Sequence, residues 1–463
     1  MIAQDVPGAT VTSRRRGILV SERKLLLAAG DAFLVATSLI LAFNLRSGPI
    51  QHAALTVPWK GVVLVTALWL AIGLVVDAYD LHAAVSARGI FRVVATTVAL
   101  EAAALLAVFF IVPFEITRPT ILIWVPVSGL TVLCWRLGYR RFFSRAIFAG
   151  RIMLVADAET VDRVWGEVDD QMAGLYRVVG TIHPADVDAG TRLTAAAVGH
   201  EADQIVLGAE EDLPTELFQS LVDCYDRGLV VRSVADVYEE LTGRLLVERL
   251  RQSWLLSLQQ RGETSRVYAM FKRVVDIVAG LVGLLILAIL LPFVWVAVKL
   301  EDRGPLFHRQ VRVGHFGRPF DILKLRTMRV QQPQASERPE LQWTALDDVR
   351  ITRVGALLRR LHLDELPQAW NILRGEMSVV GPRPEQPHYV DELRETIPYY
   401  NTRLSVRPGL TGWAQVNYGY GSGVAGSTVK LSYDLYYIKH QSVALDLLIM
   451  ARTVFAVATL KGR

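Results

Sequence analysis

The chain has 463 residues, of which 52% are hydrophobic and 21% charged, with a net charge of +5 at pH 7. This length argues against a single ordinary domain, and the mean hydropathy of +0.32 argues against a wholly water-soluble protein. No DNA- or RNA-binding motif accompanies the modest basic excess, so we expect no nucleic-acid partner. The two cysteines, Cys134 and Cys224, are too few for a disulfide framework or a zinc site, and favour a reducing, cytoplasmic setting for the soluble parts.

Four long apolar segments open the chain, and each approaches the roughly 20 residues that cross a bilayer as a helix. They run over Leu25–Leu45, Trp59–Tyr79, Ile90–Phe114 and Thr120–Tyr139. Basic residues gather before the first segment, between the second and third, and after the fourth, as in Arg14–Arg16, Arg88, Arg92, Arg140 and Arg141. The positive-inside rule therefore predicts a four-span bundle, residues 1–146, with both ends in the cytoplasm. We expect no cleavable signal peptide of the usual form before it.

One carboxylate, Glu101, falls near the middle of the third apolar segment. Ionisable residues within membrane spans are rare and commonly functional, which makes Glu101 a candidate site residue. The alternative is an inward-facing group that is paired within the bundle or protonated. The sequence leaves both interpretations open and favours the second.

Short β-rich runs alternate with helical stretches between residues 147 and 262. The runs are Ile152–Val155, Val178–Ile182, Gln204–Leu207 and Leu229–Ser233, and a helix is expected over Leu213–Asp226. This alternation predicts a small, Rossmann-like α/β module with a parallel sheet. A dinucleotide site would need glycines after the first strand, but this turn reads Ala156-Asp157-Ala158-Glu159, whose carboxylates would repel a pyrophosphate. The module is interpreted as structural or regulatory, with a bound nucleotide as the alternative.

A fifth apolar stretch, Val274–Val298, is long enough to cross a bilayer. A crossing would place all later residues on the opposite side from the α/β module. Pro292 lies inside the stretch, where it removes a helical hydrogen bond. Lys272 and Arg273 precede the stretch and Lys299 follows it, as though both flanks faced the cytoplasm. These facts favour a re-entrant helix that enters and leaves one leaflet, broken at Pro292; a simple fifth span is the alternative.

An adjacent carboxylate pair, Asp364 and Glu365, precedes a helix-like pattern of apolar residues. We expect Asp364 at the N-cap, Pro367 in the first turn and Gly375 at the end of this helix. The positive end of a helix favours an ionised carboxylate and a nearby phosphate. An ionised Asp is a competent nucleophile toward phosphorus, and a neighbouring Glu can hold Mg²⁺. A plain pair of capping residues is the alternative.

Cationic residues surround this pair in the sequence, as a phosphate-transfer site requires. Lys324 and Arg326 end a strand-like run, and Arg383 lies between two prolines that stiffen its backbone. Further candidates lead into the pair or follow it: Arg350, Arg353, Arg359, Arg360 and Arg407. Any one of them is more often a solvated charge. The C-terminal run Val443–Leu460 predicts a helix, either amphipathic on lipid headgroups or packed in a core.

Many ordered motifs between about residues 268 and 463 resemble the bacterial sugar transferases, the monotopic polyprenyl-phosphate phosphoglycosyl transferases. They are Phe271-Lys272-Arg273-Val274-Val275-Asp276, Gly304-Pro305-Leu306-Phe307, Lys324-Leu325-Arg326-Thr327-Met328, Leu363-Asp364-Glu365-Leu366-Pro367-Gln368, Val380-Gly381-Pro382-Arg383-Pro384, Arg407-Pro408-Gly409-Leu410-Thr411-Gly412 and Tyr433-Asp434. The spans, the α/β module and Val237-Tyr238-Glu239-Glu240-Leu241-Thr242-Gly243-Arg244 are similar to the long form of this family, which includes undecaprenyl-phosphate glucose-1-phosphate transferases. One departure is His362, where the family often has a small hydroxyl residue.

The resemblance implies a mostly α-helical, monotopic catalytic domain over residues 263–463, with a re-entrant helix at about 274–298. It implies an enzyme of the bacterial inner membrane, with this domain on the cytoplasmic face, that starts exopolysaccharide or capsule synthesis. The partners would be a UDP-sugar, undecaprenyl phosphate, membrane lipids and a second copy in a homodimer. UDP-glucose is the expected donor, with UDP-galactose as the alternative.

The resemblance also assigns roles to single residues. Asp364 would attack the β-phosphorus of the UDP-sugar, release UMP and carry the sugar phosphate until the polyprenyl phosphate accepts it. Glu365 would bind Mg²⁺. Phosphates would be held by Lys324, Arg359 and Arg383. Pro292 would break the membrane helix. A non-catalytic membrane scaffold and a multispan transporter are the alternatives from other classes; neither would need the carboxylate pair.

Overall fold

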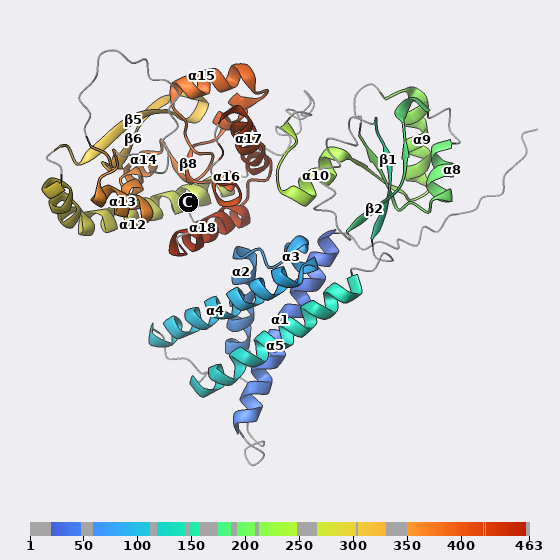
Figure 1. Ribbon diagram of the computed structural model, residues 1–463, viewed down its shortest axis with the longest axis horizontal. Coiled ribbons are helices and arrows are strands. Elements are labelled where there is room, and N and C mark those ends of the chain that lie inside the picture. Colours follow the sequence, from blue (N-terminus) through green and yellow to red (C-terminus); the bar gives the residue numbers. More distant parts are fainter. Residues whose placement is uncertain are drawn as a thin grey trace, which may run out of the picture. The chain divides into compact units, whose positions relative to one another are not determined.

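The computed structural model describes residues 20–47, 59–111, 118–143, 149–157, 175–186, 192–208, 213–247, 266–301, 304–329, 350–419, 421 and 423–459. The chain divides into two compact units, Met1–Thr242 and Gly243–Arg463 (Figure 1). The first unit holds a helical bundle and a small sheet, and the second holds the carboxylate pair. Arg14–Arg16 and the expected domain boundaries near residues 146 and 262 lie outside the described residues.

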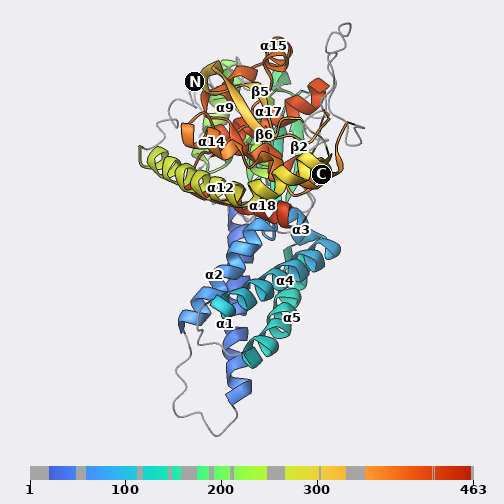
Figure 2. The ribbon, with the colours of Figure 1, turned by 90° about the vertical axis from the view of Figure 1, so that its left-hand side faces the viewer.

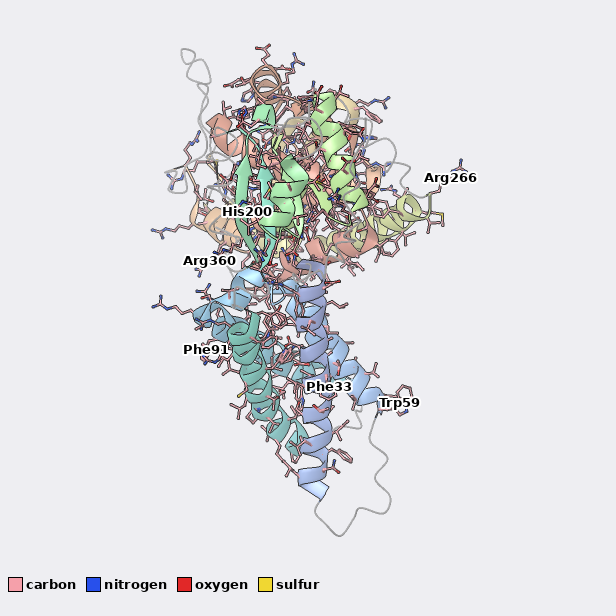
Figure 3. The ribbon with its side chains drawn as sticks, turned by 90° about the vertical axis from the view of Figure 1, so that its right-hand side faces the viewer. Phe33, Trp59, Phe91, His200, Arg266 and Arg360 are labelled. Carbon is pink, nitrogen blue, oxygen red and sulfur yellow. The ribbon has the colours of Figure 1, made fainter. Side chains whose placement is uncertain are left out.

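The N-terminal bundle has four long helices and one short one. They are α1 (Val20–Ser47), α2 (Trp59–Val75), α3 (Leu81–Val85), α4 (Ala87–Ile111) and α5 (Arg118–Phe143). Each predicted apolar segment is therefore helical. Among the described residues, four helices are long and apolar enough to cross a membrane: α1, α4, α5 and the later α12, whereas α2 has only 17 residues. Phe33, Trp59 and Phe91 lie on the outside of the bundle, as expected of side chains that face lipid (Figure 3).

Polar side chains lie inside this apolar bundle. Arg136 of α5 donates two hydrogen bonds to Asp31 of α1, at 2.5 and 3.3 Å, and both side chains are buried. Glu101 of α4 is 1% exposed, and neither of its carboxylate oxygens has a hydrogen-bond partner among the described residues. Glu101 thus faces inward, as the favoured interpretation expects; of its two forms, paired or protonated, the described residues do not show the pairing.

The small sheet of the first unit is parallel, as predicted. Its strands are β1 (Gly150–Val155), β2 (Tyr176–Ile182), β3 (Gln204–Leu207) and β4 (Val230–Ser233), in the order β2-β1-β3-β4. Helices α8 (Arg192–Gly199) and α9 (Thr215–Asp226) cover one face (Figure 1), where Met153, Ile205 and Leu217 form part of the core. Helix α10 (Val234–Thr242) ends the unit, and part of the turn after β1 lies outside the described residues.

The second unit is mostly helical. In chain order it contains α12 (Arg266–Glu301), β5 (Phe307–Val313), η5 (His315–Gly317), β6 (Pro319–Leu325), α13 (Arg353–Arg360), η6 (Leu363–Glu365), α14 (Gln368–Arg374), β7 (Ser378–Val380), α15 (Pro387–Thr396), η7 (Tyr400–Ser405), β8 (Gly409–Thr411), α16 (Trp413–Asn417), α17 (Gly423–Lys439) and α18 (Val443–Ala458). Strands β5 and β6 form an antiparallel hairpin, and β7 pairs with β8 in parallel. The predicted C-terminal helix is present as α18, which lies beside α12 (Figure 2).

Helix α12 is continuous over 36 residues with Pro292 inside it, so the structure does not show the break that the sequence predicts at Pro292. A proline removes only one helical hydrogen bond, and the rest of the helix continues past it. Near its start, Lys272 donates to Val380 O at 2.9 Å and Asp446 Oδ2 at 2.9 Å. At its end, the carboxylate of Glu301 accepts hydrogen bonds from the first backbone amides of α13 at 2.6 and 2.9 Å. The opposite face is apolar and open, with Leu285 62% and Phe293 72% exposed. Both ends of this apolar helix are thus held by one and the same polar domain.

Candidate active site

The carboxylate pair occupies a tight turn between two helices. Helix α13 ends before His362, which has a left-handed backbone with a φ of 55°. Asp364 and Glu365 follow in the 3₁₀ turn η6, and α14 begins only at Gln368, with Pro367 at its N-cap. The expectation that Asp364 caps this helix is therefore wrong, because the reversal at His362 gives the pair a turn of its own. Gly375 ends α14 with a φ of 77°, as predicted.

Glu365 is held by two cations from distant parts of the chain. Lys324 at the end of β6 and Arg383 each donate to the same oxygen, Oε1, at 2.9 Å. The Glu365 side chain is only 15% exposed. Burial opposes its ionisation, but Arg383 and Lys324 outweigh burial and hold the pKa of Glu365 well below its usual value. Glu365 is therefore a fixed negative charge between two positive ones.

The surroundings of Asp364 differ from those of Glu365. It is half-buried, and no described residue forms an ion pair with its carboxylate. Burial and the neighbouring charge of Glu365 raise the pKa of Asp364, and Lys324 and Arg359 only partly oppose this. A carboxylate with a raised pKa is more basic than an ordinary one, and without a bound cation it is open to attack an incoming group.

Two further predicted cations lie around the turn. Arg359 of α13 donates from Nε to Thr327 Oγ1 at 2.8 Å, and its terminal nitrogens donate to no residue in the described part of the chain. Those nitrogens have the donor geometry that suits a phosphate. Arg326 is 8% exposed and packs its guanidinium against Gly304, so closely that any side chain at position 304 would overlap it. Arg359 is thus close enough to the carboxylate pair to lower the pKa of Asp364, whereas the Arg326 side chain is buried within the domain.

In the loop that carries Arg383, every backbone carbonyl from Pro382 to Glu385 accepts a hydrogen bond. The four donors are, in order, Gly409 N at 2.9 Å, Arg403 Nη2 at 3.0 Å, Arg312 Nη1 at 3.1 Å and Val313 N at 2.9 Å. At its start, the amide of Gly381 donates to Thr411 O at 2.8 Å. A loop with so many constraints fixes the direction in which the Arg383 side chain leaves it, and Arg383 reaches Glu365.

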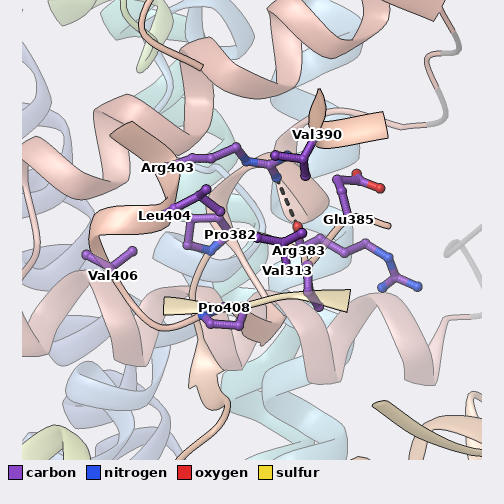
Figure 4. A pocket seen from close by; sticks show the side chains of 11 residues that line it. Val313, Pro382, Arg383, Glu385, Val390, Arg403, Leu404, Val406 and Pro408 are labelled. Atoms are coloured by element: carbon purple, nitrogen blue, oxygen red, sulfur yellow. Dashed lines mark hydrogen bonds between the residues drawn. The ribbon is translucent and has the colours of Figure 1, made fainter. Parts of the chain in front are cut away.

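A buried ion pair supports this loop and was not identified from the sequence. Arg403 lies 2.9 Å from Asp434 of α17 and donates to Tyr400 Oη at 2.6 Å, while its other nitrogen donates to the carbonyl of Arg383 (Figure 4). Burial raises the pKa of Asp434 to about 6, against the attraction of Arg403. In the sequence, Asp434 stands out only as part of a family motif. Arg403 lies 20 residues after Arg383 and 31 residues before Asp434, and separations of this size leave no local pattern.

A small pocket lies against the backbone of the Arg383 loop (Figure 4). Pro382, Pro384, Leu404 and Val406 contribute to its lining, but neither residue of the carboxylate pair does. Arg383 also lines this pocket, but the pocket does not include the carboxylate pair, so it is not the site where Arg383 meets Glu365.

The carboxylates could hold a divalent cation only with help from a ligand. Among the described residues, no group of three or more His, Cys, Asp or Glu side chains is placed to bind a metal ion. Glu365 Oε2 receives no hydrogen bond from a described residue, and the Asp364 carboxylate has no ion-pair partner there. Mg²⁺ is commonly bound by one or two carboxylates together with substrate phosphates and water. The residues present fit that pattern.

With this geometry established, comparison with known proteins is informative. The sequence model of the bacterial sugar transferase family matches residues 267–460. A UDP-glucose:undecaprenyl-phosphate glucose-1-phosphate transferase of Caulobacter vibrioides is 41% identical over 213 residues, which are 44% of this chain and 76% of the relative. This chain belongs to the bacterial sugar transferase family. The matched region contains the turn, the Arg383 loop and every predicted residue of the phosphate-transfer site, but not Glu101.

Two further relatives are named for different sugars. A UDP-N-acetylgalactosamine-undecaprenyl-phosphate N-acetylgalactosaminephosphotransferase of Aeromonas hydrophila is 39% identical over 250 residues, 54% of this chain and 57% of the relative. The undecaprenyl-phosphate glucose phosphotransferase of Komagataeibacter xylinus is 32% identical over 329 residues, 66% of this chain and 58% of the relative. The chain thus spans somewhat more than half the length of these two relatives, and their names disagree on the sugar.

Proposed function

We propose that this sugar transferase moves a hexose 1-phosphate from a UDP-sugar to undecaprenyl phosphate, with Asp364 as a covalent carrier. One observation carries the proposal: Asp364 has a raised pKa and no ion-pair partner in the described part of the chain, whereas the adjacent Glu365 is held by Lys324 and Arg383. The names of the relatives supply the substrate classes.

In the first step, a carboxylate oxygen of Asp364 attacks the phosphorus that carries the sugar. The new bond joins this oxygen to phosphorus, and the bond to the bridging oxygen breaks, so that UMP leaves with the electron pair. Lys324, Arg359 and Arg383 offset the negative charge on the phosphates, which is the main requirement of phosphoryl transfer. When Glu365 is engaged by Lys324 and Arg383, those cations are already oriented for the substrate.

In the second step, a phosphate oxygen of undecaprenyl phosphate attacks the phosphorus held on Asp364. The bond between Asp364 and phosphorus breaks, and the carboxylate takes back its electron pair. The products are undecaprenyl-diphosphate-sugar and a free Asp364. Because Asp364 is regenerated, a single residue serves both half-reactions, and no proton needs to be stored between them.

Mg²⁺ is part of the proposal, with Glu365 Oε2 as the ligand that the chain would supply. When bound, the ion would neutralise phosphate charge and favour the departure of UMP. Glu365 already lies close to two cations, so binding depends on the added negative charge of the UDP-sugar.

The membrane placement follows from the packing of α12. A helix of 36 residues is about 54 Å long, well over the roughly 30 Å hydrocarbon core, and Pro292 interrupts its hydrogen bonding. A straight crossing would separate Lys272 from Glu301 by the bilayer, although the same domain contacts both. We therefore propose that α12 bends at Pro292 in the membrane and returns to its side of entry, the cytoplasmic face of the inner membrane in a bacterium. A homodimer is retained as a family expectation.

The donor is proposed to be UDP-glucose, since several relatives are named for glucose. The test offers UDP-glucose, UDP-galactose or UDP-N-acetylgalactosamine to the purified protein with Mg²⁺ and undecaprenyl phosphate. We expect UMP and a lipid diphosphate sugar from UDP-glucose, and neither from the Asp364→Asn variant. Turnover of another donor alone would reassign the sugar. Absence of turnover with every donor would contradict the enzyme and favour a membrane scaffold.

A further inference from the structure

The start of the apolar helix α12 is joined to the end of α14 by one arginine. Arg273 donates from Nη1 to Ile372 O at 2.8 Å and from Nη2 to Leu373 O at 2.7 Å. Carbonyls in the last turn of a helix lack their usual partner four residues on, and a guanidinium can donate to two of them at once. The two helices also approach closely, since a Cβ at Gly280 would lie 2.8 Å from the side chain of Leu373. The end of α14 is therefore fixed on α12.

About one turn further along α12, a buried carboxylate holds the strand that follows α14. Asp276 is 1% exposed, and its Oδ1 accepts hydrogen bonds from Ser378 Oγ at 2.9 Å and from Val379 N at 2.8 Å. Both donors belong to β7, which leads directly into the Arg383 loop. A buried acceptor that serves two donors is costly to remove, because both donors then lose their partner. Asp276 therefore fixes the strand from which this loop leaves.

These contacts hold both limbs of one closed segment of the chain. Glu365 and Arg383 are 18 residues apart, at the two ends of a segment that contains α14 and β7, and their side chains meet at 2.9 Å. Arg273 holds the limb that leaves Glu365, and Asp276 holds the limb that returns to Arg383. The two holding residues are separated by about 4.5 Å of helix rise on α12. The spacing of the limbs on α12 therefore sets where Arg383 arrives.

Resting on the proposed function, we infer that Asp276 is a positioning residue of the phosphate-transfer site and acts through Arg383. At 1% exposure, Asp276 itself is closed to a substrate. It acts by holding β7, because a shift of this strand moves the Arg383 guanidinium away from Glu365 and from the phosphates. A displacement of about 1 Å in a group that positions a substrate can lower the rate about a hundredfold. The alternative is a carboxylate that only stabilises the fold, and the two roles differ in what happens once Arg383 is removed.

A double-mutant cycle in the full-length protein in detergent separates these two roles. Asp276→Leu removes the acceptor at similar volume, and it should lower kcat/KM for the UDP-sugar that the wild type turns over by about tenfold. In an Arg383→Ala background, the same substitution should lower the remaining kcat/KM by less than about twofold, because the group through which Asp276 acts is gone. Asp276→Asn keeps an acceptor oxygen for both donors and should recover most of the loss.

Ser378→Ala is the milder variant, which serves if Asp276→Leu does not fold. It removes one of the two hydrogen bonds and should cause a smaller loss that also disappears in the Arg383→Ala background. Ser442→Ala is the matched control, since it removes a hydroxyl hydrogen bond at the N-cap of α18 in the same unit, and it should leave kcat/KM unchanged in both backgrounds. Equal losses with and without Arg383, or no loss in either variant, would overturn the inference. Absence of transfer by the wild type would overturn the proposed function, and the inference with it.

Discussion

The carboxylate turn and the Arg383 loop meet at Glu365, yet they are constructed in opposite ways. In the loop, each carbonyl from Pro382 to Glu385 accepts a hydrogen bond, and a buried ion pair stands behind it. In the turn, Asp364 has no ion-pair partner among the described residues, and its pKa is raised. The residues that position charge are each held by several hydrogen bonds or ion pairs. The carboxylate proposed to react has no such ion pair with a described residue.

Removing the open carboxylate should have the largest effect. Asp364→Asn is expected to lower UMP release by at least about a thousandfold, because the amide cannot form the phosphate ester. The thermal midpoint of the protein should not fall, since burial already disfavours the charge of Asp364. A variant that keeps most of its UMP release would show that another residue attacks the donor.

Loosening the fixed loop should have a smaller effect on transfer. Arg403→Lys keeps a positive charge near Asp434, but a compact ammonium lacks the planar fork with which the guanidinium reaches Asp434, Tyr400 and the Arg383 carbonyl together. We expect a fall in kcat/KM for the UDP-sugar of about tenfold, with the folded protein retained. Arg394→Lys is the control, since Arg394 forms an exposed ion pair with Asp391 on α15, away from the residues that hold the loop. Equal activity of the two variants would show that the contacts of Arg403 with the Arg383 loop do not affect transfer.

Acid should move stability and transfer in opposite directions at Asp434. The folded state raises its pKa from 3.8 to about 6, so its contribution to stability is full below pH 3.8 and is lost as the pH rises toward 6. Relative to Asp434→Asn, the wild type should therefore gain thermal stability as the pH falls through this window. Transfer should decline, because protonation removes the charge that holds Arg403. A parallel decline of both would contradict this assignment.

The smallest effect is expected at the start of the turn. His362 has a φ of 55°, a conformation in which a side chain costs about 1 kcal/mol relative to glycine. His362→Gly should raise the free energy of unfolding by about that amount if the reversal alone explains the residue. Gly375→Ala, at a φ of 77°, is the matched opposite and should lower it similarly. Activity lost in His362→Gly beyond a few-fold would indicate that the imidazole contacts substrate.

The local patterns of the sequence predicted much of this architecture. Apolar length predicted the long helices, and β-rich runs predicted the parallel sheet. The structure brings the predicted cations Lys324 and Arg383 to Glu365, and the roles of these residues stay predictions. The missing parts depend on distant contacts. The N-cap assignment of Asp364 was wrong because the sequence around His362 has no pattern that predicts its left-handed backbone. The contact between Arg403 and the Arg383 loop could not be predicted from their spacing in the sequence.

The most direct test of a carrier at Asp364 is the intact mass of the purified protein after incubation with Mg²⁺ and UDP-glucose, with no lipid acceptor present. The account predicts a hexose-phosphate adduct that maps to the peptide with Asp364, is absent from Asp364→Asn, and disappears when undecaprenyl phosphate is added. An adduct on another residue, or product formation with UMP release only when both substrates are present, would contradict it.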